Sequence, residues 1–369
     1  MRNLALMWVL AGCLLGCGGD SDGLTWYCGP EKKPRAVKAV LKDGTLTVSG
    51  KGAMKDFREP SDRGLIMEPW GRTLTHYDEV YKESMKARRA KYWPPWYFIL
   101  EYDSTILITD VIIGEGVTHI GDMAFAGLPE LKHITIPASV SSIGKESLVS
   151  FDCCGGGDIG SLTSITVAAD NAYYSSENGI LFNKNKTTLI LYPRGKQQTA
   201  YTIPNNVTSI GEIAFCSCQN LTSVTIPNSV TSIEKLAFSY CFSLKSLTIP
   251  NSVTSIGEGA FKVCDNMTSI IIPNSVTKIG RYVFYGTGLT SITIPNSITF
   301  IGKDAFLFSF DLTSVTSLNP IPPDLERKAL ENILSTACLY VPKVSIDAYR
   351  NANGWKDFEC IKPIASAPK

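Results

Sequence analysis

The stretch Leu221-Thr-Ser-Val-Thr-Ile-Pro-Asn-Ser-Val-Thr-Ser-Ile233 occurs many times, with small changes, in this chain of 369 residues. Its Ile-Pro pair returns at Ile249-Pro250 and at Ile272-Pro273, 23 residues later each time. A fixed period of this length indicates a solenoid, in which each turn buries its apolar side only by stacking on its neighbours. The units begin at Ile108, Leu131, Leu162, Gln198, Leu221, Leu244, Met267, Leu289, Leu312 and Thr336.

Each unit carries the pattern of a short strand followed by a tight turn. The residues Val224-Thr225-Ile226 alternate apolar and polar side chains and are β-branched, which favours a strand. Pro227 lacks a backbone donor and therefore ends the strand. A second apolar pair, Val230 and Ile233, comes next, and Phe238 then fills the inside of the turn. We therefore predict a β-rich coil with columns of apolar residues in its core.

The repeated Leu-Thr-Ser-Val-Thr-Ile-Pro-Asn-Ser-Val motif, with its later Ala-Phe and Cys, resembles the BspA-type (Treponema-type) leucine-rich repeats over about residues 106–318. Residues 178–193 resemble the inserted hairpin unit of that family, and 339–356 resemble its C-terminal closing segment. The resemblance implies a right-handed leucine-rich-repeat coil with a parallel sheet on the concave face and a short helical or irregular convex side. It also implies a surface location and binding to host or neighbouring-cell components.

The N-terminus has the features of a bacterial lipoprotein signal peptide at residues 1–17. Arg2 precedes an apolar run that is too short to span a membrane as a mature helix. Cys17 is the expected lipid attachment site, and a lipid would be the chain's membrane contact. Cys13 is the alternative, although it leaves a shorter apolar run, and an ordinary secretory signal is a further alternative. The expected location is the outer membrane or cell surface.

The remaining chain divides into a tether, two caps and the repeats. The N-terminal cap contains a hairpin around Asp43-Gly44, because Asp-Gly is a strong hairpin signal. It also contains a charged helix at about 72–92, whose basic cluster is either a partner patch or a solvated face. The predicted segments are the tether at 18–25, the N-terminal cap at 26–105, the repeats at 106–318 with insertions at 151–160 and 173–197, and the C-terminal cap at 319–369.

Eight of the eleven cysteines fall into three groups. Three occupy one repeat position, three residues after the column Phe, which predicts a column of free core thiols: Cys218, Cys241 and Cys264. Three lie in the caps, where disulfides are plausible but their pairing cannot be read from the sequence: Cys28, Cys338 and Cys360. The adjacent Cys153 and Cys154 indicate a flexible loop, with a metal or redox site as the alternative.

The sequence does not favour an enzyme. It contains no phosphate-binding loop, no nucleophile elbow and no zinc-protease motif, and its three histidines form no Cys/His zinc pattern. We therefore expect no catalytic residue, no cofactor and no metal. A net charge of +1 gives no reason to expect a nucleic-acid partner, and we expect a monomer.

The candidate binding surface consists of the outward positions of the first strand in each unit. Most carry Ser or Thr, which suit many weak hydrogen bonds, and the alternative is that they are only solvated sheet. The residues that depart from the repeat are the better candidates, as are two insertion tyrosines. The candidates are Lys132, His133, Thr135, Thr166, Thr225, Lys245, Thr248, Ile271, Thr293, Tyr173 and Tyr174, with Phe300 as a further departure.

The sequence and the resemblance favour a non-enzymatic surface lipoprotein that mediates adhesion or binds an extracellular protein or glycan. One alternative is a glycan-capture lipoprotein for nutrient uptake, which predicts exposed aromatic pairs such as Trp93/Trp96 or Tyr173/Tyr174. The other is a structural scaffold of the cell envelope.

Overall fold

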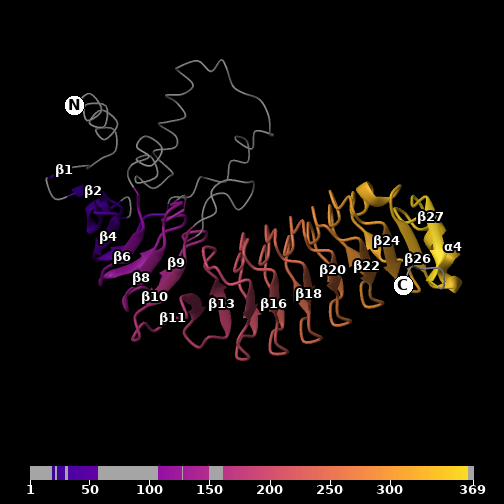
Figure 1. The fold of residues 1–369 in the computed structure, drawn as a ribbon, viewed down its shortest axis with the longest axis horizontal. Helices are drawn as coiled ribbons and strands as arrows, with labels where there is room; N and C mark the ends of the chain where they lie inside the picture. Colours follow the sequence, from indigo (N-terminus) through magenta and orange to yellow (C-terminus); the bar gives the residue numbers. More distant parts are fainter. Residues whose placement is uncertain are drawn as a thin grey trace, which may run out of the picture. The chain divides into compact units, whose positions relative to one another are not determined.

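The computed structural model describes residues 19–20, 23–29, 32–56, 107–126, 128–148 and 161–364. It forms two compact units (Figure 1): Met1–Ser161 with Thr166–Tyr173, and Leu162–Ile165 with Tyr174–Lys369. Several predictions lie outside the described residues: the signal peptide with Cys13 and Cys17, the helix at 72–92, Trp93/Trp96, and the 151–160 insertion with Cys153 and Cys154.

The first unit begins with an antiparallel sheet that becomes parallel. Strands β3 and β4 form the predicted hairpin, with Gly44 at φ 76°. Strand β4 then pairs in parallel with β6, so that the hairpin supplies the first rung for the repeats. The sheet order is β1-β2-β3-β4-β6-β8-β10, and a second sheet has the order β5-β7-β9. The strands are β1 (Gly19–Asp20), β2 (Gly23–Tyr27), β3 (Val37–Lys42), β4 (Thr45–Gly50), β5 (Gly52–Ala53), β6 (Asp110–Ile113), β7 (Val117–Ile120), β8 (His133–Ile136), β9 (Ser142–Ile143) and β10 (Ser164–Val167), with a 3-10 helix η1 (Pro34–Ala36).

The structure differs from the expected tether at 18–25. Gly19–Asp20 pairs with Gly23–Leu24 as β1 and β2, and β2 continues to Tyr27 against β3. The stretch Leu24-Thr25-Trp26-Tyr27 is rich in strand-forming residues, and Trp26 is buried. The cap sheet therefore starts earlier than the sequence prediction placed it.

The second unit is a solenoid of parallel strands, with two strands in each regular turn. The first strands are β14 (Ala200–Thr202), β16 (Ser223–Thr225), β18 (Ser246–Thr248), β20 (Ser269–Ile271), β22 (Ser291–Ile294) and β24 (Ser314–Ser317). The second strands are β13 (Thr188–Leu191), β15 (Ser209–Ile210), β17 (Ser232–Ile233), β19 (Ser255–Ile256), β21 (Lys278–Ile279), β23 (Phe300–Ile301) and β25 (Asp324–Leu325). Equivalent residues pair across turns, as in Ser209↔Ser232 and Ser232↔Ser255.

The inserted hairpin and the C-terminal closing segment lie at the two ends of this unit. The hairpin consists of β11 (Tyr174–Glu177) and β12 (Ile180–Asn183), which pair antiparallel as the sequence predicted. The closing segment contains η2 (Glu331–Ile333), β26 (Cys338–Val341), η3 (Lys343–Ser345), α4 (Ile346–Asn351) and β27 (Cys360–Pro363). Within the described ranges, α4 is the only α-helix.

The third side of each turn is irregular, in agreement with the expected side opposite the sheet. In the turn around Phe238, Leu236 and Tyr240 adopt positive φ angles of 55° and 60°. The backbone still bonds to the next turn there, because the Phe238 amide donates to the Ala260 carbonyl at 2.8 Å. All three sides of the coil are thus joined by hydrogen bonds between turns.

The core consists of stacked columns. The rings from Phe215 to Phe306 are buried and lie nearly parallel, with centroid separations of 4.9 Å for Phe215–Phe238 and 5.9 Å for Phe261–Phe284. Each ring adds its own burial and a stacking contact of about 0.5–1.5 kcal/mol with its neighbour. The predicted apolar columns are therefore confirmed.

The repeated Asn-Ser and Val-Thr-Ser segments have structural roles. Ser229 Oγ donates to the carbonyl of Val207 one turn earlier, at 2.7 Å, and Thr231 Oγ1 donates to the carbonyl of Thr208 at 3.1 Å. These hydroxyls satisfy backbone acceptors at the edges of the short strands, where ladder bonds end. Much of the Ser and Thr content of the repeat is thereby explained by the fold.

The cysteine column is confirmed, and it continues beyond the cysteines. Cys241 Sγ contacts the Phe215 carbonyl at 3.0 Å and Cys264 Sγ the Phe238 carbonyl at 3.1 Å, and both are buried free thiols. Ser309 occupies the same repeat position, and its hydroxyl donates to the Phe284 carbonyl at 2.7 Å. Burial raises the pKa of Cys264 to about 12 and the pKa of Cys218 well above its usual value. The thiols therefore stay protonated and unreactive at neutral pH.

The C-terminal segment closes the last turn with specific polar contacts. The buried hydroxyl of Tyr349 lies 2.6 Å from Ser317 Oγ, and Trp355 Nε1 donates to the Pro323 carbonyl at 2.8 Å. Cys338 and Cys360 form a disulfide between β26 and β27, whereas Cys28 is free and buried in the first unit. The structure thus assigns the pairing that the sequence left open.

Candidate binding surfaces

The outward positions of the first strands form an exposed row in the second unit, which we call the front face. Its residues are Thr222, Ser223, Thr225, Lys245, Ser246, Thr248, Thr268, Ser269, Ile271, Thr290, Ser291 and Thr293. Adjacent strands are joined throughout, since Lys245 N donates to Thr222 O and Thr268 N donates to Lys245 O. The candidates on neighbouring strands therefore lie side by side, and Thr248 and Ile271 are direct partners.

Two residues stand out on the front face. Ile271 is 62% exposed, although it is a branched apolar residue in a row of small polar ones. Lys245 is exposed at the first position of its strand, where the neighbouring turns carry Thr222 and Thr268. Both depart from the repeat without contributing to the core, which makes them candidates for ligand contact.

The candidates in the first unit include a histidine beside a carboxylate. Lys132, His133 and Thr135 are exposed on or beside β8, and Thr166 is exposed on β10. His133 Nδ1 lies 3.0 Å from Asp110 Oδ1 on β6. A hydrogen bond from Thr109 to Asp110, together with His133, lowers the pKa of that carboxyl. His133 is therefore held in place by a neighbour one turn away, rather than being unattached.

The tyrosines at the start of the inserted hairpin differ in exposure. Tyr173 is 56% exposed, whereas Tyr174, the first residue of β11, is half-buried. Phe300 on β23 is also half-buried, and its backbone pairs with Lys278 and Asp324. Of these three aromatic candidates, Tyr173 offers the largest accessible ring.

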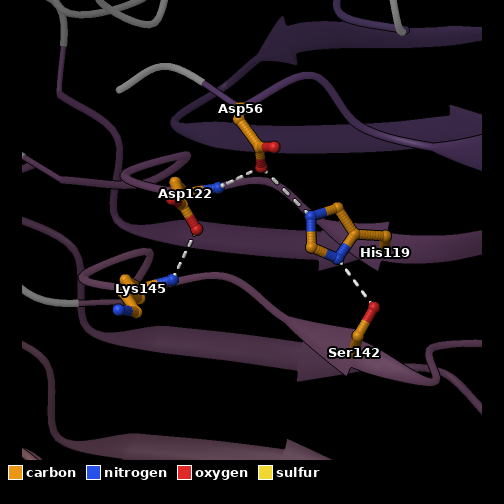
Figure 2. A network of polar contacts seen from close by, with 5 residues as sticks. All are labelled: Asp56, His119, Asp122, Ser142 and Lys145. Carbon is orange, nitrogen blue, oxygen red and sulfur yellow. Dashed lines mark hydrogen bonds and ion pairs between the residues drawn. The ribbon is translucent and has the colours of Figure 1, made fainter. Parts of the chain in front are cut away.

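A polar network occupies the second sheet of the first unit (Figure 2). His119 on β7 lies 2.7 Å from Ser142 Oγ through Nδ1 and 3.2 Å from Asp56 Oδ1 through Nε2. The same Asp56 oxygen accepts from the Asp122 amide at 2.9 Å, and Asp122 Oδ1 accepts from the Lys145 amide at 2.7 Å. The sequence considered Asp56 only as an unplaced carboxylate.

An Asp–His–Ser chain of contacts resembles the order of a hydrolase triad, but the register accounts for it here. His119 and Ser142 are direct partners of β7 and β9, and in the second unit Ser232 Oγ contacts Ser209 Oγ at 2.9 Å in the same way. Asp56 is occupied with a backbone amide of the next turn. The network is therefore an inter-turn clamp in which carboxylates satisfy backbone donors. Among the described residues, no group of three or more His, Cys, Asp or Glu is arranged to hold a metal ion.

A third surface, on the irregular side of the second unit, was missed by the sequence analysis. We call it the aromatic ridge, and its residues are Tyr240, Phe242, Tyr282, Tyr285, Phe308 and Phe310 with the cations Lys262 and Arg281. The sequence contained a signal for this surface, namely an aromatic residue at a repeat position where other turns carry polar ones. At the position of Phe310, four residues after the column Phe, other turns carry Gln219 and Asp265.

The parallel ladders, the stacked apolar columns and the exposed front face define a leucine-rich-repeat solenoid. The sequence profile described as "BspA type Leucine rich repeat region" matches residues 101–190 and 194–313 in 6 copies, which is more than half of the chain. The chain therefore belongs to the BspA-type leucine-rich-repeat family. No curated protein matches the sequence.

Solved structures of bacterial leucine-rich-repeat proteins are similar to the chain at low identity. A leucine-rich repeat protein from Eubacterium ventriosum is 22% identical, with 94% of this chain and 96% of that chain covered and a TM-score of 0.44. One from Bacteroides ovatus is 24% identical, with 69% and 61% covered and a TM-score of 0.43. A leucine rich cell surface protein from Faecalibacterium prausnitzii is 23% identical, with 71% and 61% covered and a TM-score of 0.37. The alignment thus spans 61% of the length of each of the last two.

Proposed function

We propose that this chain is a non-enzymatic, lipid-anchored protein of the bacterial cell surface that binds an extracellular protein or glycan along the front face. The observation that carries the proposal is the composition of that face. It is a continuous, exposed strip of short polar side chains, interrupted by Ile271 and Lys245. Such a surface suits a ligand that spreads many weak contacts over several turns.

The Cys338–Cys360 disulfide supports export of the chain. Disulfides form and persist in oxidising compartments and are rare in the reducing cytosol. The N-terminal sequence supports the same location, because an apolar run ends at Cys17. No helix in the described ranges is long and apolar enough to cross a membrane. The proposed membrane contact is the lipid on Cys17.

A binding experiment with a matched control tests the role of the front face. The mature chain is titrated onto immobilised basement-membrane extract, onto intact epithelial cells and onto envelope fractions of its own cell. The front-face variant is Lys245→Gln with Ile271→Thr. The control is Lys278→Gln with Val344→Thr. It also changes one lysine and one branched apolar residue, but at exposed positions outside the front face, and Val344 is 92% exposed.

We expect saturable binding to the extract or the cells. The front-face variant should weaken it about tenfold, as loss of one apolar and one charged contact implies, and the control should leave it unchanged. Equal loss in both variants, or no binding to extracellular material, would reject the proposal. Binding to the envelope fractions alone would favour the scaffold alternative instead.

A further inference from the structure

The aromatic ridge contains two groups of touching rings, and the Lys262 side chain lies between them. Tyr282 and Tyr285 meet edge to face with their centroids 5.6 Å apart, and Tyr285 meets Phe308 in the same way at 5.1 Å. Phe308 in turn lies 5.8 Å from Phe310. Edge-to-face packing is a favourable geometry for aromatic pairs, so each ring fixes the orientation of the next.

Phe308 and Phe310 are not needed for the core. Phe308 is 45% exposed and Phe310 is 64% exposed, whereas the preceding column residue Phe306 is fully buried. Two other turns carry Ser217 and Gly286 at the repeat position of Phe308 and still form the coil. The aromatic residues therefore carry an exposure cost that the fold does not require, as expected for a binding surface.

Two cations accompany the rings without entering an ion pair within the described ranges. The Lys262 ammonium lies 5.3 Å from the centre of the Tyr285 ring and 5.6 Å from that of Tyr240. The Arg281 guanidinium lies 4.5 Å from the Tyr282 ring and donates to its hydroxyl at 2.7 Å. Cation–π contacts hold both groups in place while leaving their charge unneutralised.

The acidic groups that act on Arg281 do not cancel its charge. Glu258 and Asp304 act on Arg281 electrostatically, but only as weaker influences than its hydrogen bond to Tyr282. Asp304 is buried and lies 3.9 Å from Lys303 Nζ. An anionic group on a ligand would therefore find two positioned cations beside exposed ring faces.

We propose that the aromatic ridge binds an acidic polysaccharide. Its sugar rings would stack on Phe308 and Phe310, and its carboxylate or sulfate groups would pair with Lys262 and Arg281. A glycan fits better than a protein segment for two reasons. Phe308 and Phe310 project from the surface, whereas protein hot spots are desolvated in packed pockets. The ridge also crosses successive turns, which suits an extended polymer. The inference rests on the proposed function only in that the chain meets glycans outside the cell.

Retention on immobilised glycans tests the ridge separately from the front face. The mature chain is passed over heparin, polygalacturonate and uncharged dextran, and its affinity for heparin oligosaccharides is measured by calorimetry at several NaCl concentrations. The ridge variants are Phe308→Ala with Phe310→Ala, and Lys262→Gln. The control is Lys278→Gln with Val344→Thr, two exposed residues that belong to neither the aromatic ridge nor the front face. Thermal melts verify that each variant is folded.

We expect retention on at least one acidic glycan but not on dextran, with weaker binding at higher salt because ion pairs are screened. The double Phe variant should lose about tenfold or more in affinity, and Lys262→Gln about threefold to fivefold. The control variant should bind as the unaltered chain does. Such a result would support the ridge even if the front face failed its own test.

Three outcomes would overturn the inference. The first is equal retention on dextran and on the acidic glycans. The second is acidic-glycan binding that the ridge variants leave unchanged. The third is binding to a protein in the basement-membrane extract that survives removal of its glycans and is lost in the ridge variants, which would make the ridge a protein site.

Discussion

Cys338 and Cys360 are direct partners on the parallel strands β26 and β27, and a disulfide joins them with a Cα–Cα distance of 4.7 Å. The bond ties the last strand of the described chain to the turn before it. Because β27 is the end strand of its sheet, its other edge lacks a strand neighbour in that sheet. The disulfide therefore stabilises the place where a stack of turns is most open to fraying.

Replacing Cys338 and Cys360 together by Ser should destabilise the C-terminal turn by about 3 kcal/mol, from the loop entropy of a 22-residue separation. Hydrogen exchange of the β27 amides measures the effect. Those amides should exchange faster, while the amides of β16 keep their protection. Unchanged protection of β27 would show that Tyr349 and Trp355 close the turn without the bond.

Replacing Phe261 by Ala should remove the middle ring from the stacked column. The expected loss is about 3–5 kcal/mol, because a fully buried ring is replaced by a cavity. In a stack of turns that contact only their neighbours, a weak middle turn also separates the two halves. Urea unfolding followed at Trp355 and by circular dichroism should then show two transitions.

The matched control is Phe261→Leu, which keeps an apolar side chain at that position. This variant should lower the free energy of unfolding by less than Phe261→Ala does, and urea unfolding should still show one transition. A single transition with the Ala variant as well would contradict the nearest-neighbour description of this solenoid.

The thiol column predicts a loss of stability at alkaline pH. Burial raises the pKa of Cys264 from 9.0 to about 12, so the folded state holds a proton that the unfolded state releases above pH 9. The contribution is complete below pH 9 and is lost as the pH rises from 9 towards 12. The slope is about 1.4 kcal/mol per pH unit for each such thiol.

Urea unfolding at pH 8 and pH 10.5 measures this slope. In Cys264→Ser the loss of unfolding free energy per pH unit should be smaller by the contribution of one thiol, because a hydroxyl does not titrate in this range. Ser309 shows that a hydroxyl fits the column. An unaltered slope in the Ser variant would show that Cys264 does not contribute to the alkaline loss.

The inter-turn clamp of the first unit predicts a graded effect at Asp56. In Asp56→Ala the Asp122 amide loses its carboxylate acceptor, and because this hydrogen bond is exposed to water, the cost should be about 0.5–1.5 kcal/mol. In Asp56→Asn an oxygen acceptor remains, and the cost should be smaller. Thermal unfolding and exchange of the Asp122 amide measure both. An Asn variant as unstable as the Ala variant would show that the carboxylate charge, rather than the hydrogen bond, is what matters.

The proposed lipid anchor predicts that Cys17→Ser abolishes lipid labelling of the protein. The variant should then either keep its signal peptide or fractionate as a soluble protein, because it lacks the proposed lipid. Labelling with a radioactive fatty acid and membrane fractionation measure this, with Cys13→Ser as the control. Labelling lost in the Cys13 variant alone would place the anchor there.

The periodic part of the fold could be predicted because one pattern repeats many times. The step of 23 residues fixes which side chains stack, and Phe238 or Cys241 can be assigned to a column from spacing alone. The pairing of Cys338 with Cys360 could not be assigned, because it depends on two strands being in register across a segment without a repeat. The early start of the cap sheet was missed because Gly19–Asp20 and Gly23 resemble a tether.

The binding surfaces were predicted less completely. The outward positions of the strands follow from alternation, so the exposure of Lys245 and Ile271 could be predicted, whereas their role in binding stays a prediction. The aromatic ridge was missed because its residues occupy irregular turns, where spacing does not indicate which way a side chain points. Tyr285 and Phe308 come into contact only through the stacking of two turns.

The register between turns has an evolutionary consequence. Ser209, Ser232 and Ser255 pair in sequence, as do Ile210, Ile233 and Ile256, so each turn presents nearly the same surface to the next. Deleting or duplicating one complete 23-residue unit would therefore join two surfaces that already match. Recombination between gene segments that encode similar units could lengthen or shorten the protein while each product still folds. The length of the front face would then change without a change in its local chemistry.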